Sequence, residues 1–252
     1  MSPPGRRAMR RDPLVLVPPS EGKAEGGRAT MRPGAFDAAL AQHRRAVVVA
    51  LAEAVHDDAS AARVLGCRGD LLDRARAATA ALVDGTAPLR AAADRYTGVV
   101  WQHLGPLSTT ERRRVLVPSA LYGITTAADA IVDYRLKLSV VLPGVGRLDR
   151  SWSAPITELL ASRCRGRVLV DVLPSEHARA IDWATLEQSV DVVHVEFRRA
   201  DGGGAAGHAA KAAKGRFTRV VLDGGLDAAR RFAWEGWRAV PAGDGIDVLA
   251  PG

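Results

Sequence analysis

Two apolar stretches of the sequence each end in the tripeptide Pro-Ser-Glu. The first, LVLVPPSEGK, spans residues 14–23, and the second, VLVDVLPSE, spans residues 168–176. The polar residues that follow the two apolar runs are Ser20, Glu21, Lys23, Ser175 and Glu176. Carboxylates and an amine at such positions can transfer protons or hold an anion. If both runs are strands of one sheet, their ends open onto one cleft, where ligands of α/β sheets usually bind.

The first stretch also contains a Gly-Lys pair, which raises the question of a nucleotide-binding P-loop. A P-loop has a glycine five positions before that pair and a Ser or Thr directly after it. Val17 and Ala24 occupy those positions, so the segment is not a P-loop. A plain turn after a strand is the simpler interpretation of this segment. For Ser175 the simpler interpretation is the cap of a helix that begins at Glu176.

Lysine is scarce in this arginine-rich sequence. Of the 35 basic residues, the lysines are Lys23, Lys137, Lys211 and Lys214. An arginine-biased chain keeps a lysine where a compact, strongly hydrated ammonium is needed rather than a planar guanidinium. We therefore take these four positions as candidates for anion binding, with chance as the alternative explanation for any single one.

The segment HAAKAAKGRFTRVV, residues 208–221, predicts a helix with one cationic face. Lys211, Lys214, Gly215 and Thr218 share that face, and Arg219 lies at its edge. A glycine in mid-helix costs about 1 kcal/mol relative to alanine, so Gly215 indicates that a phosphate or carboxylate approaches the backbone there. The alternative is an amphipathic helix whose basic face is merely solvated.

Two further segments contribute charged and phenolic candidates. The alternation in VDYRLKLSVVL, residues 132–142, predicts a strand that places Arg135 and Lys137 on one face. Two like charges repel there unless an anion lies between them; alternatively, they protect an exposed edge strand. Arg95-Tyr96-Thr97-Gly98 interrupts a helical stretch, so Tyr96 is either a proton donor or part of a helix kink.

A helix-hairpin-helix-like element is predicted over residues 109–130. Ser108-Thr109-Thr110-Glu111 is a capping box that starts a short helix, and a turn at Ser119–Gly123, which contains Tyr122, precedes a second helical stretch. In helix-hairpin-helix modules, backbone N–H groups of the turn hold a DNA phosphate without reading a base. An ordinary connection between helices is the alternative.

Composition limits the class of protein. The chain has 252 residues, of which 47% are hydrophobic and 25% charged, as is typical of globular domains. Four arginines and Asp12 give residues 1–13 a charge of +3, which leaves +4 of the net +7 for the rest. We expect residues 1–13 to be a disordered basic tail and residues 14–252 to form one mildly basic domain.

Targeting and cofactor signals are missing from the sequence. Its longest apolar run is too short to span a bilayer, and its N-terminus lacks the apolar segment of a secretory signal. Neither the two cysteines nor the six histidines have metal-ligand spacing. We expect a cytoplasmic protein that does not bind a membrane and uses no metal or other cofactor.

Strand and helix patterns are mixed along the chain rather than strictly alternating. Strands are predicted at 14–17, 168–172 and 191–199, and a hairpin at 237–240 and 246–249. Helices are predicted at 37–56, 70–83, 88–104, 153–164 and 208–222. These patterns predict an α/β (mixed α+β) fold: a single compact domain with a mixed sheet flanked by helices.

Taken in order, these segments resemble the YaaA family, the peroxide-stress proteins of bacteria. The matching segments are PPSEGK (18–23), RYTG (95–98), LYG (121–123), YRLKL (134–138), the region of Trp152, VLPSEHARAI (172–181) and HAAKAAKGRFTRVV (208–221). The resemblance implies a compact mixed α/β domain with a helix-hairpin-helix element and a positively charged cleft. It also implies a role in limiting iron-driven oxidative DNA damage and binding to duplex or branched DNA. Mapped onto this chain, the hairpin is Ser119–Gly123 and the cleft draws on Lys23, Arg135, Lys137, Lys211, Lys214 and Arg219.

Two functions are consistent with these residues. The first is a peroxide-stress protein that binds DNA non-specifically through a basic cleft. The second is an enzyme acting on a small anionic substrate, such as a nucleobase or nucleotide, in the same cleft. In that enzyme Glu21 or Glu176 is the general base, Lys23 and Lys211 hold the anion, and Tyr96 or Tyr122 donates a proton.

Overall fold

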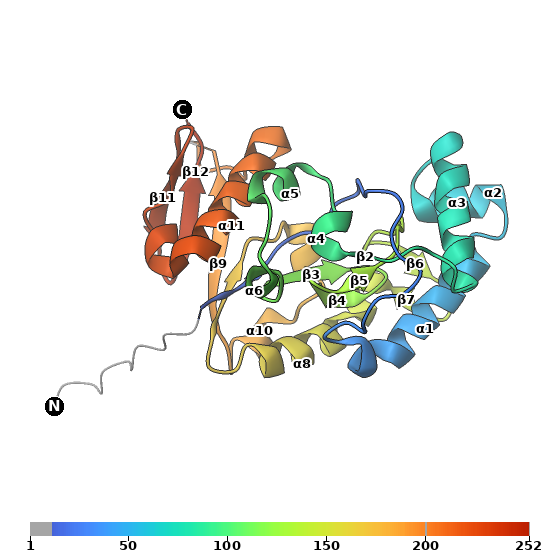
Figure 1. The fold of residues 1–252 in the computed structure, drawn as a ribbon. Coiled ribbons are helices and arrows are strands. Elements are labelled where there is room, and N and C mark those ends of the chain that lie inside the picture. The colour runs from blue at the N-terminus through green and yellow to red at the C-terminus, as the bar shows by residue number, and fades with distance from the viewer. Residues whose placement is uncertain (1–11, 200, 252) are drawn as a thin grey trace.

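The computed structural model describes residues 12–199 and 201–251 (Figure 1). Its strands are β1 (Leu14–Leu16), β2 (Arg90–Ala91), β3 (Val115–Ser119), β4 (Gly123–Thr126), β5 (Ala130–Ile131), β6 (Val141–Leu142), β7 (Gly146–Arg147), β8 (Val168–Asp171), β9 (Asp191–Arg198), β10 (Ala233–Trp234), β11 (Trp237–Ala242) and β12 (Gly245–Leu249). Its helices are α1 (Asp37–Ala54), α2 (Asp58–Leu65), α3 (Asp70–Val83), α4 (Ala92–Arg95), α5 (Val99–Leu104), α6 (Thr109–Arg112), α7 (Leu148–Ser151), α8 (Ser153–Arg163), α9 (Ser175–Ala178), α10 (Trp183–Leu186) and α11 (Gly207–Ala229). Of the predicted basic tail, residues 1–11 lie outside the described residues.

One mixed sheet of eight strands organises the fold. Its strand order is β10-β11-β12-β9-β8-β1-β3-β4. The five strands from β12 to β3 in this order run parallel to their neighbours, and antiparallel strands complete both edges. Leu14 of β1 pairs with Leu169 of β8, so both Pro-Ser-Glu segments leave the sheet at the same edge. The prediction that they open onto one side of the sheet is therefore confirmed.

Helices cover both faces of the sheet. Figure 1 shows α5 and α11 on one side of it and α8 and α10 on the other. Leu14, Val15 and Leu16 are fully buried, as expected of a central parallel strand with both faces covered. Phe217 of α11 contacts Phe197 of β9 edge-to-face, with ring centroids 5.9 Å apart. The predicted mixed α/β domain, with a mixed sheet flanked by helices, is thus confirmed.

Two predicted elements differ from the structure between residues 109 and 142. The helix that starts at Thr109 ends at Arg112, and Ser119–Gly123 joins β3 to β4 in an antiparallel hairpin, with Ser119 paired to Gly123. The helix-hairpin-helix predicted there was wrong. Val115, Leu116 and Val117 are fully buried in the sheet, where β-branched side chains pack well, so burial decided against the helix.

The strand predicted at residues 132–142 was also wrong for most of its length. Only Val141 and Leu142 are in a strand, and the preceding residues form an irregular segment. Tyr134 and Leu138 are buried, while Arg135 lies between them and donates from Nε to the carbonyl oxygen of Leu65 at 3.0 Å. The apolar alternation thus reflects a buried loop rather than a strand.

Candidate functional site

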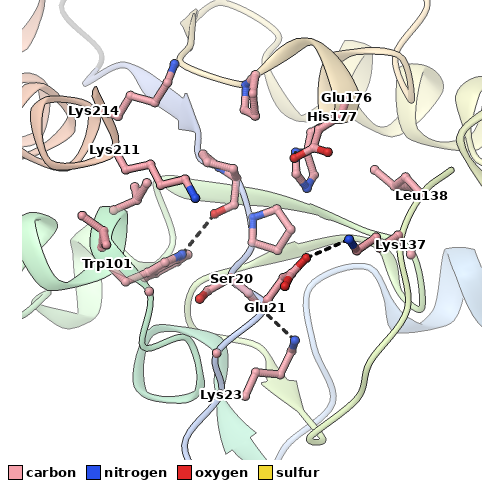
Figure 2. Close-up of a pocket in the computed structure, with 18 of the residues that line it drawn as sticks. Ser20, Glu21, Lys23, Trp101, Lys137, Leu138, Glu176, His177, Lys211 and Lys214 are labelled. Carbon is pink, nitrogen blue, oxygen red and sulfur yellow. Dashed lines mark hydrogen bonds and ion pairs between the residues drawn. The ribbon is translucent and has the colours of Figure 1, made fainter. Parts of the chain in front are cut away.

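A cavity of about 500 Å³ lies at the carboxyl edge of the parallel strands (Figure 2). Its walls come from the segments that follow β1, β3, β8 and β9, together with the start of α5, the start of α11 and the irregular segment 134–139. Strand ends of an α/β sheet commonly form ligand sites because the loops after them converge there. The volume is within the range of pockets that hold small organic ligands.

All four lysines of the chain line this cavity. They are Lys23 after β1, Lys137 in the irregular segment, and Lys211 and Lys214 on α11. Arg135 is the arginine among the lining residues, in a chain whose other basic residues are arginines. The scarce lysines are therefore gathered at one site.

Lys23 is half-buried at the end of the first Pro-Ser-Glu segment. Its Nζ donates to the carbonyl oxygen of Ser20 at 2.8 Å and lies 4.3 Å from the ring centroid of Tyr134. The Tyr96 ring lies 5.7 Å from the same amine. Burial lowers the pKa of Lys23 to about 8, because desolvation disfavours the ammonium.

Lys211 and Lys214 line the cavity from one side of α11. The Lys214 Nζ donates to the carbonyl oxygen of Val172 at 3.1 Å and lies 4.1 Å from the centroid of Phe197. Burial lowers the pKa of Lys214 to about 8 as well. Lys211 is exposed, and Figure 2 shows it extending from the helix into the space beside Trp101.

Glu21 is the carboxylate that neutralises part of this charge. Its oxygens lie 3.1 Å from the Lys137 Nζ and 3.6 Å from an Arg135 guanidinium nitrogen. The hydrogen bond from Lys137 is the main cause of a lowered pKa for Glu21, which keeps it ionised. The Glu21 carboxylate thus contacts both Arg135 and Lys137 and supplies the negative charge that the sequence predicted between them.

Glu176 and His177 line the wall opposite Glu21, at the second strand end. Glu176 is largely exposed, and one of its oxygens lies 3.5 Å from the His177 Nδ1. Within the described part of the chain, that nitrogen has no hydrogen-bond partner although it is buried. Burial lowers the pKa of His177, which favours a neutral imidazole. The sequence analysis did not select His177, because an isolated histidine gives no spacing signal.

Apolar side chains form the rest of the wall. Trp101 of α5 donates from Nε1 to the carbonyl oxygen of Pro18 at 3.0 Å, which ties α5 to the segment after β1. Gly98 permits this approach, because a Cβ there would lie 2.3 Å from the Ser20 Oγ. Leu136 and Leu138 line the cavity from the irregular segment. The wall of the cavity thus combines cationic and apolar side chains.

The chain was compared with known proteins once this geometry was established. A sequence model of one family, described as Peroxide stress protein YaaA, matches residues 14–242. The chain belongs to the YaaA family of peroxide stress proteins. This confirms the resemblance found in the sequence.

Relatives of the chain carry the family designation UPF0246. One from Streptomyces coelicolor is 33% identical over 264 aligned residues, which cover 94% of this chain and 98% of that protein. A UPF0246 protein from Corynebacterium efficiens is 33% identical over 156 residues, covering 59% of this chain and 62% of the relative. A third, from Bacteroides thetaiotaomicron, is 29% identical over 157 residues, covering 56% and 61%. The family match and the Streptomyces coelicolor relative cover nearly the whole chain, whereas the other two relatives align with little more than half of it.

Three of the candidate residues that the sequence suggested, Tyr96, Ser175 and Tyr122, do not line the cavity. Tyr96 is buried behind Lys23 and shares a hydrogen bond of 3.1 Å with Tyr134, whose hydroxyl is also 2.8 Å from the Ser119 Oγ. Ser175 is an exposed first residue of α9 and makes no cap bond. The Tyr122 hydroxyl accepts the N–H of Val132 at 3.0 Å, and desolvation by burial raises its pKa to about 12.

Three further candidate residues from the sequence, Gly123, Gly215 and Arg219, have structural roles instead. Gly123 has a φ of 71°, and a Cβ there would lie 2.6 Å from the Trp152 ring. Gly215 faces α5 rather than a ligand, because its Cβ would lie 2.3 Å from the carbonyl oxygen of Val100. The prediction that Gly215 admits an anion to the backbone was wrong. Arg219 is paired with Glu111 and, at 2.8 Å, with Asp223, away from the cavity.

The structure was also searched for metal and membrane features. Over residues 12–199 and 201–251, no group of three or more His, Cys, Asp and Glu side chains is arranged to hold a metal ion. None of the helices in that part of the chain combines the length and apolar composition needed to cross a bilayer. Cys67 and Cys164 form no disulfide.

Proposed function

We propose that the cavity is the active site of an enzyme that acts on a small organic anion, with nucleobases and nucleotides as the first substrate class to test. The observation that carries this proposal is the gathering of all four lysines around one cavity. A cytoplasmic location is part of the proposal, and the two free thiols support it.

The charges at the cavity do not balance. Lys137 and Arg135 share Glu21, whereas Lys23, Lys211 and Lys214 have no carboxylate within ion-pair distance among the described residues. Burying ammonium groups without counter-charge is unfavourable, as the lowered pKa values of Lys23 and Lys214 express. A bound anion would supply the missing charge and restore ordinary protonation of both amines.

The apolar side chains of the wall define the other part of the ligand. Trp101, Leu136 and Leu138 offer contact to a hydrocarbon or aromatic body, while the lysines hold its charged end. An inorganic ion would leave the apolar wall in contact with water. The combination favours an organic anion.

Three side chains at the cavity, Glu21, Glu176 and His177, can move protons. Glu21 is ionised but held by two cations, which weakens it as a base. Burial lowers the pKa of His177, which favours the neutral imidazole, and the residue lines the cavity, so its ring can accept a proton from a bound molecule. His177 therefore joins Glu21 and Glu176 as a candidate general base.

A thermal-shift screen of nucleobases, nucleotides and small carboxylates tests the proposal. A ligand at about 100 times its Kd adds roughly 2.7 kcal/mol to the free energy of unfolding. Lys211→Ala should cut this stabilisation to about half or less at the same ligand concentration, whereas Arg45→Ala removes an equal charge from an exposed position on α1 and should leave it intact. If no organic anion stabilises the protein, or if both variants respond alike, the cavity is not the site.

Non-specific DNA binding is the second candidate, and one observation favours it. α2 and α3 are joined by the tight turn Gly66–Gly69, whose terminal glycines have φ values of 62° and 56°. A Cβ at either would meet nothing within 4 Å, so the backbone there is open to a phosphate. Asp70 and Asp73, in the first turn of α3, oppose this by placing negative charge beside the turn.

A DNA mobility shift between 50 and 200 mM salt tests this second candidate. Binding through phosphates weakens steeply over that range because counterions are released. Arg68→Ala, in the turn itself, should reduce the salt dependence, with Arg45→Ala as the matched control. Absence of binding at the lowest salt concentration would eliminate the candidate.

A further inference from the structure

We propose that Lys23 is a nucleophilic amine that condenses with the carbonyl group of an anionic aldehyde or ketone to form an imine. This inference rests on the proposed function, because it assigns a substrate class and a reaction to the same cavity.

A lysine at this position is chemically different from an arginine. Arginine would supply a positive charge equally well, and it is the basic residue that this chain uses in most places. A guanidinium stays protonated, however, whereas a buried lysine can lose its proton and act as a nucleophile. A carbonyl-condensing role is therefore open to Lys23 and closed to arginine.

The surroundings of Lys23 favour the neutral amine. Its Nζ has one hydrogen bond, to the Ser20 carbonyl oxygen, and no carboxylate within ion-pair distance in the described part of the chain. The lowered pKa agrees with this geometry. Figure 2 shows the amine directed toward the Ser20–Glu21 segment, and Lys23 is among the residues that line the cavity.

The neighbours of Lys23 distinguish it from Lys214, the other buried amine. The charges of Asp133 and Glu21 act against desolvation at Lys23, as that of Asp171 does at Lys214, so nearby carboxylates do not separate the two amines. The Lys23 amine lies over two phenol rings, 4.3 Å from the centroid of Tyr134 and 5.7 Å from that of Tyr96, and their two hydroxyls are hydrogen-bonded to each other at 3.1 Å. Lys214 instead faces the Phe197 ring, which can neither give nor take a proton. The geometry therefore favours Lys23 as the amine that reacts.

The proposed step balances without an oxidant or reductant. The nitrogen lone pair of Lys23 forms a bond to the carbonyl carbon, and the π electrons move to the oxygen. One proton passes from nitrogen to that oxygen to give a carbinolamine. The hydroxyl then leaves with the second amine proton as water, and the C=N bond forms. An amine and a carbonyl compound become an imine and one molecule of water.

Reductive trapping of the full-length protein tests the proposal. The protein is incubated with glyoxylate, a small anionic aldehyde, and sodium cyanoborohydride, and carboxymethylation of each lysine is then measured by peptide mass spectrometry. An amine whose pKa lies about two units below that of an ordinary lysine has roughly 100 times the neutral fraction near neutral pH. We expect Lys23 to be labelled about tenfold faster than Lys137, because neutral amines react and lower basicity weakens the nucleophile.

Controls separate this result from general lysine reactivity. Lys23→Arg should lose the adduct at position 23 and keep the labelling of Lys211 and Lys214, while Arg45→Ala, at an exposed position on α1, should leave the Lys23 adduct unchanged. Labelling of Lys23 no faster than Lys137, or faster labelling of Lys214 than of Lys23, would overturn the proposal. Stabilisation by organic anions without an adduct at Lys23 would overturn this inference alone, whereas the absence of both would remove the proposed function as well.

Discussion

The two halves of α11 hold their cations in opposite ways. In the first half, Lys211 and Lys214 line the cavity, and neither has a carboxylate within ion-pair distance among the described residues. In the second half, Arg219 is paired with Glu111 and Asp223 and also donates to the carbonyl oxygen of Pro106 at 3.2 Å. One helix thus carries an arginine whose charge is paired within the fold and two lysines whose charge has no carboxylate partner among the described residues.

The same contrast separates two histidines on neighbouring segments. His194 of β9 lies between Asp171 and Glu187, with its ring nitrogens 3.0 and 2.8 Å from their oxygens. His177 lines the cavity, and its buried Nδ1 has no hydrogen-bond partner among the described residues, with a Glu176 oxygen 3.5 Å away. The hydrogen bond to Asp171 is the main reason that the pKa of His194 rises to about 9, whereas burial lowers that of His177. Unmatched polar groups gather at the cavity, which is the pattern expected of a functional site.

Gly215→Ala should destabilise the packing of α11 against α5. The added Cβ would lie 2.3 Å from the Val100 carbonyl oxygen and 2.8 Å from the His103 Cβ, so α5 must move away from α11. We expect a net loss of roughly 2 kcal/mol in urea unfolding, the cost of overpacking less the gain in helix propensity.

Gly204→Ala is the matched control for that substitution. A Cβ at Gly204 meets nothing within 4 Å, and its stability should change by less than about 0.5 kcal/mol. If Gly215→Ala keeps wild-type stability but loses ligand binding, the glycine serves ligand approach after all.

Arg219→Ala and Lys211→Ala should have opposite consequences. Removing Arg219 leaves Glu111 without its partner and should lower the free energy of unfolding by roughly 1–3 kcal/mol, with ligand affinity unchanged. Removing Lys211 should leave the free energy of unfolding unchanged. It should weaken the binding of the anion by at least about tenfold, which is the effect of one lost charge-assisted hydrogen bond. Urea unfolding and isothermal titration calorimetry measure the two properties. Equal losses of stability in the two variants would contradict the distinction between the two halves of α11.

Ligand affinity should depend on pH in the range where the buried amines titrate. The pKa values of Lys23 and Lys214 are about 8 in the free protein, and an anion binds their charged forms. Affinity should therefore hold below pH 8 and fall by up to roughly tenfold per unit above it for each lysine that contacts the anion. Calorimetry between pH 7 and 9.5 measures this dependence. Affinity constant across that range would place the anion away from both amines.

Substitution of His194 should give the smallest of these effects, and it should change stability but not ligand affinity. Its pKa rises from 6.5 to about 9 on folding, so its contribution is fully present below pH 6.5 and is lost as the pH rises through 9. His194→Gln should flatten that part of the pH–stability curve measured by urea unfolding. The side chain is 41% exposed, so solvent screening keeps the effect modest. An unchanged slope would show that the two carboxylates do not hold a charged imidazole.

Much of the fold could be read from the sequence because its central strands are buried on both faces. The apolar runs at 14–17 and 168–172 identified β1 and β8, and their shared Pro-Ser-Glu endings placed both at one edge. The predictions for residues 109–130 and 132–142 were wrong, because the conformation of these segments depends on which neighbouring element packs over them. Short patterns there are compatible with a helix, strand or buried loop, and long-range packing made the choice.

The candidate site was predictable to a similar extent. Lysine scarcity pointed to four residues that line one cavity, and strand-end position pointed to Glu21 and Glu176. Arg219 shared the helical face in the sequence, but Glu111, which pairs with it, comes from a helix more than 100 residues earlier. His177 could not be singled out, because its lack of a partner is a property of the folded surroundings.

The ionisation of the lysines themselves tests the central claim most directly. With selectively ¹³C-labelled lysine, the chain gives one Cε signal for each of Lys23, Lys137, Lys211 and Lys214, and each signal follows the charge of its amine. We predict that two signals titrate near pH 8 in the free protein and move to higher pH when a stabilising anion is bound. Four signals that all titrate as ordinary exposed lysines, unaffected by any organic anion, would contradict the claim that the cavity holds charge for a ligand.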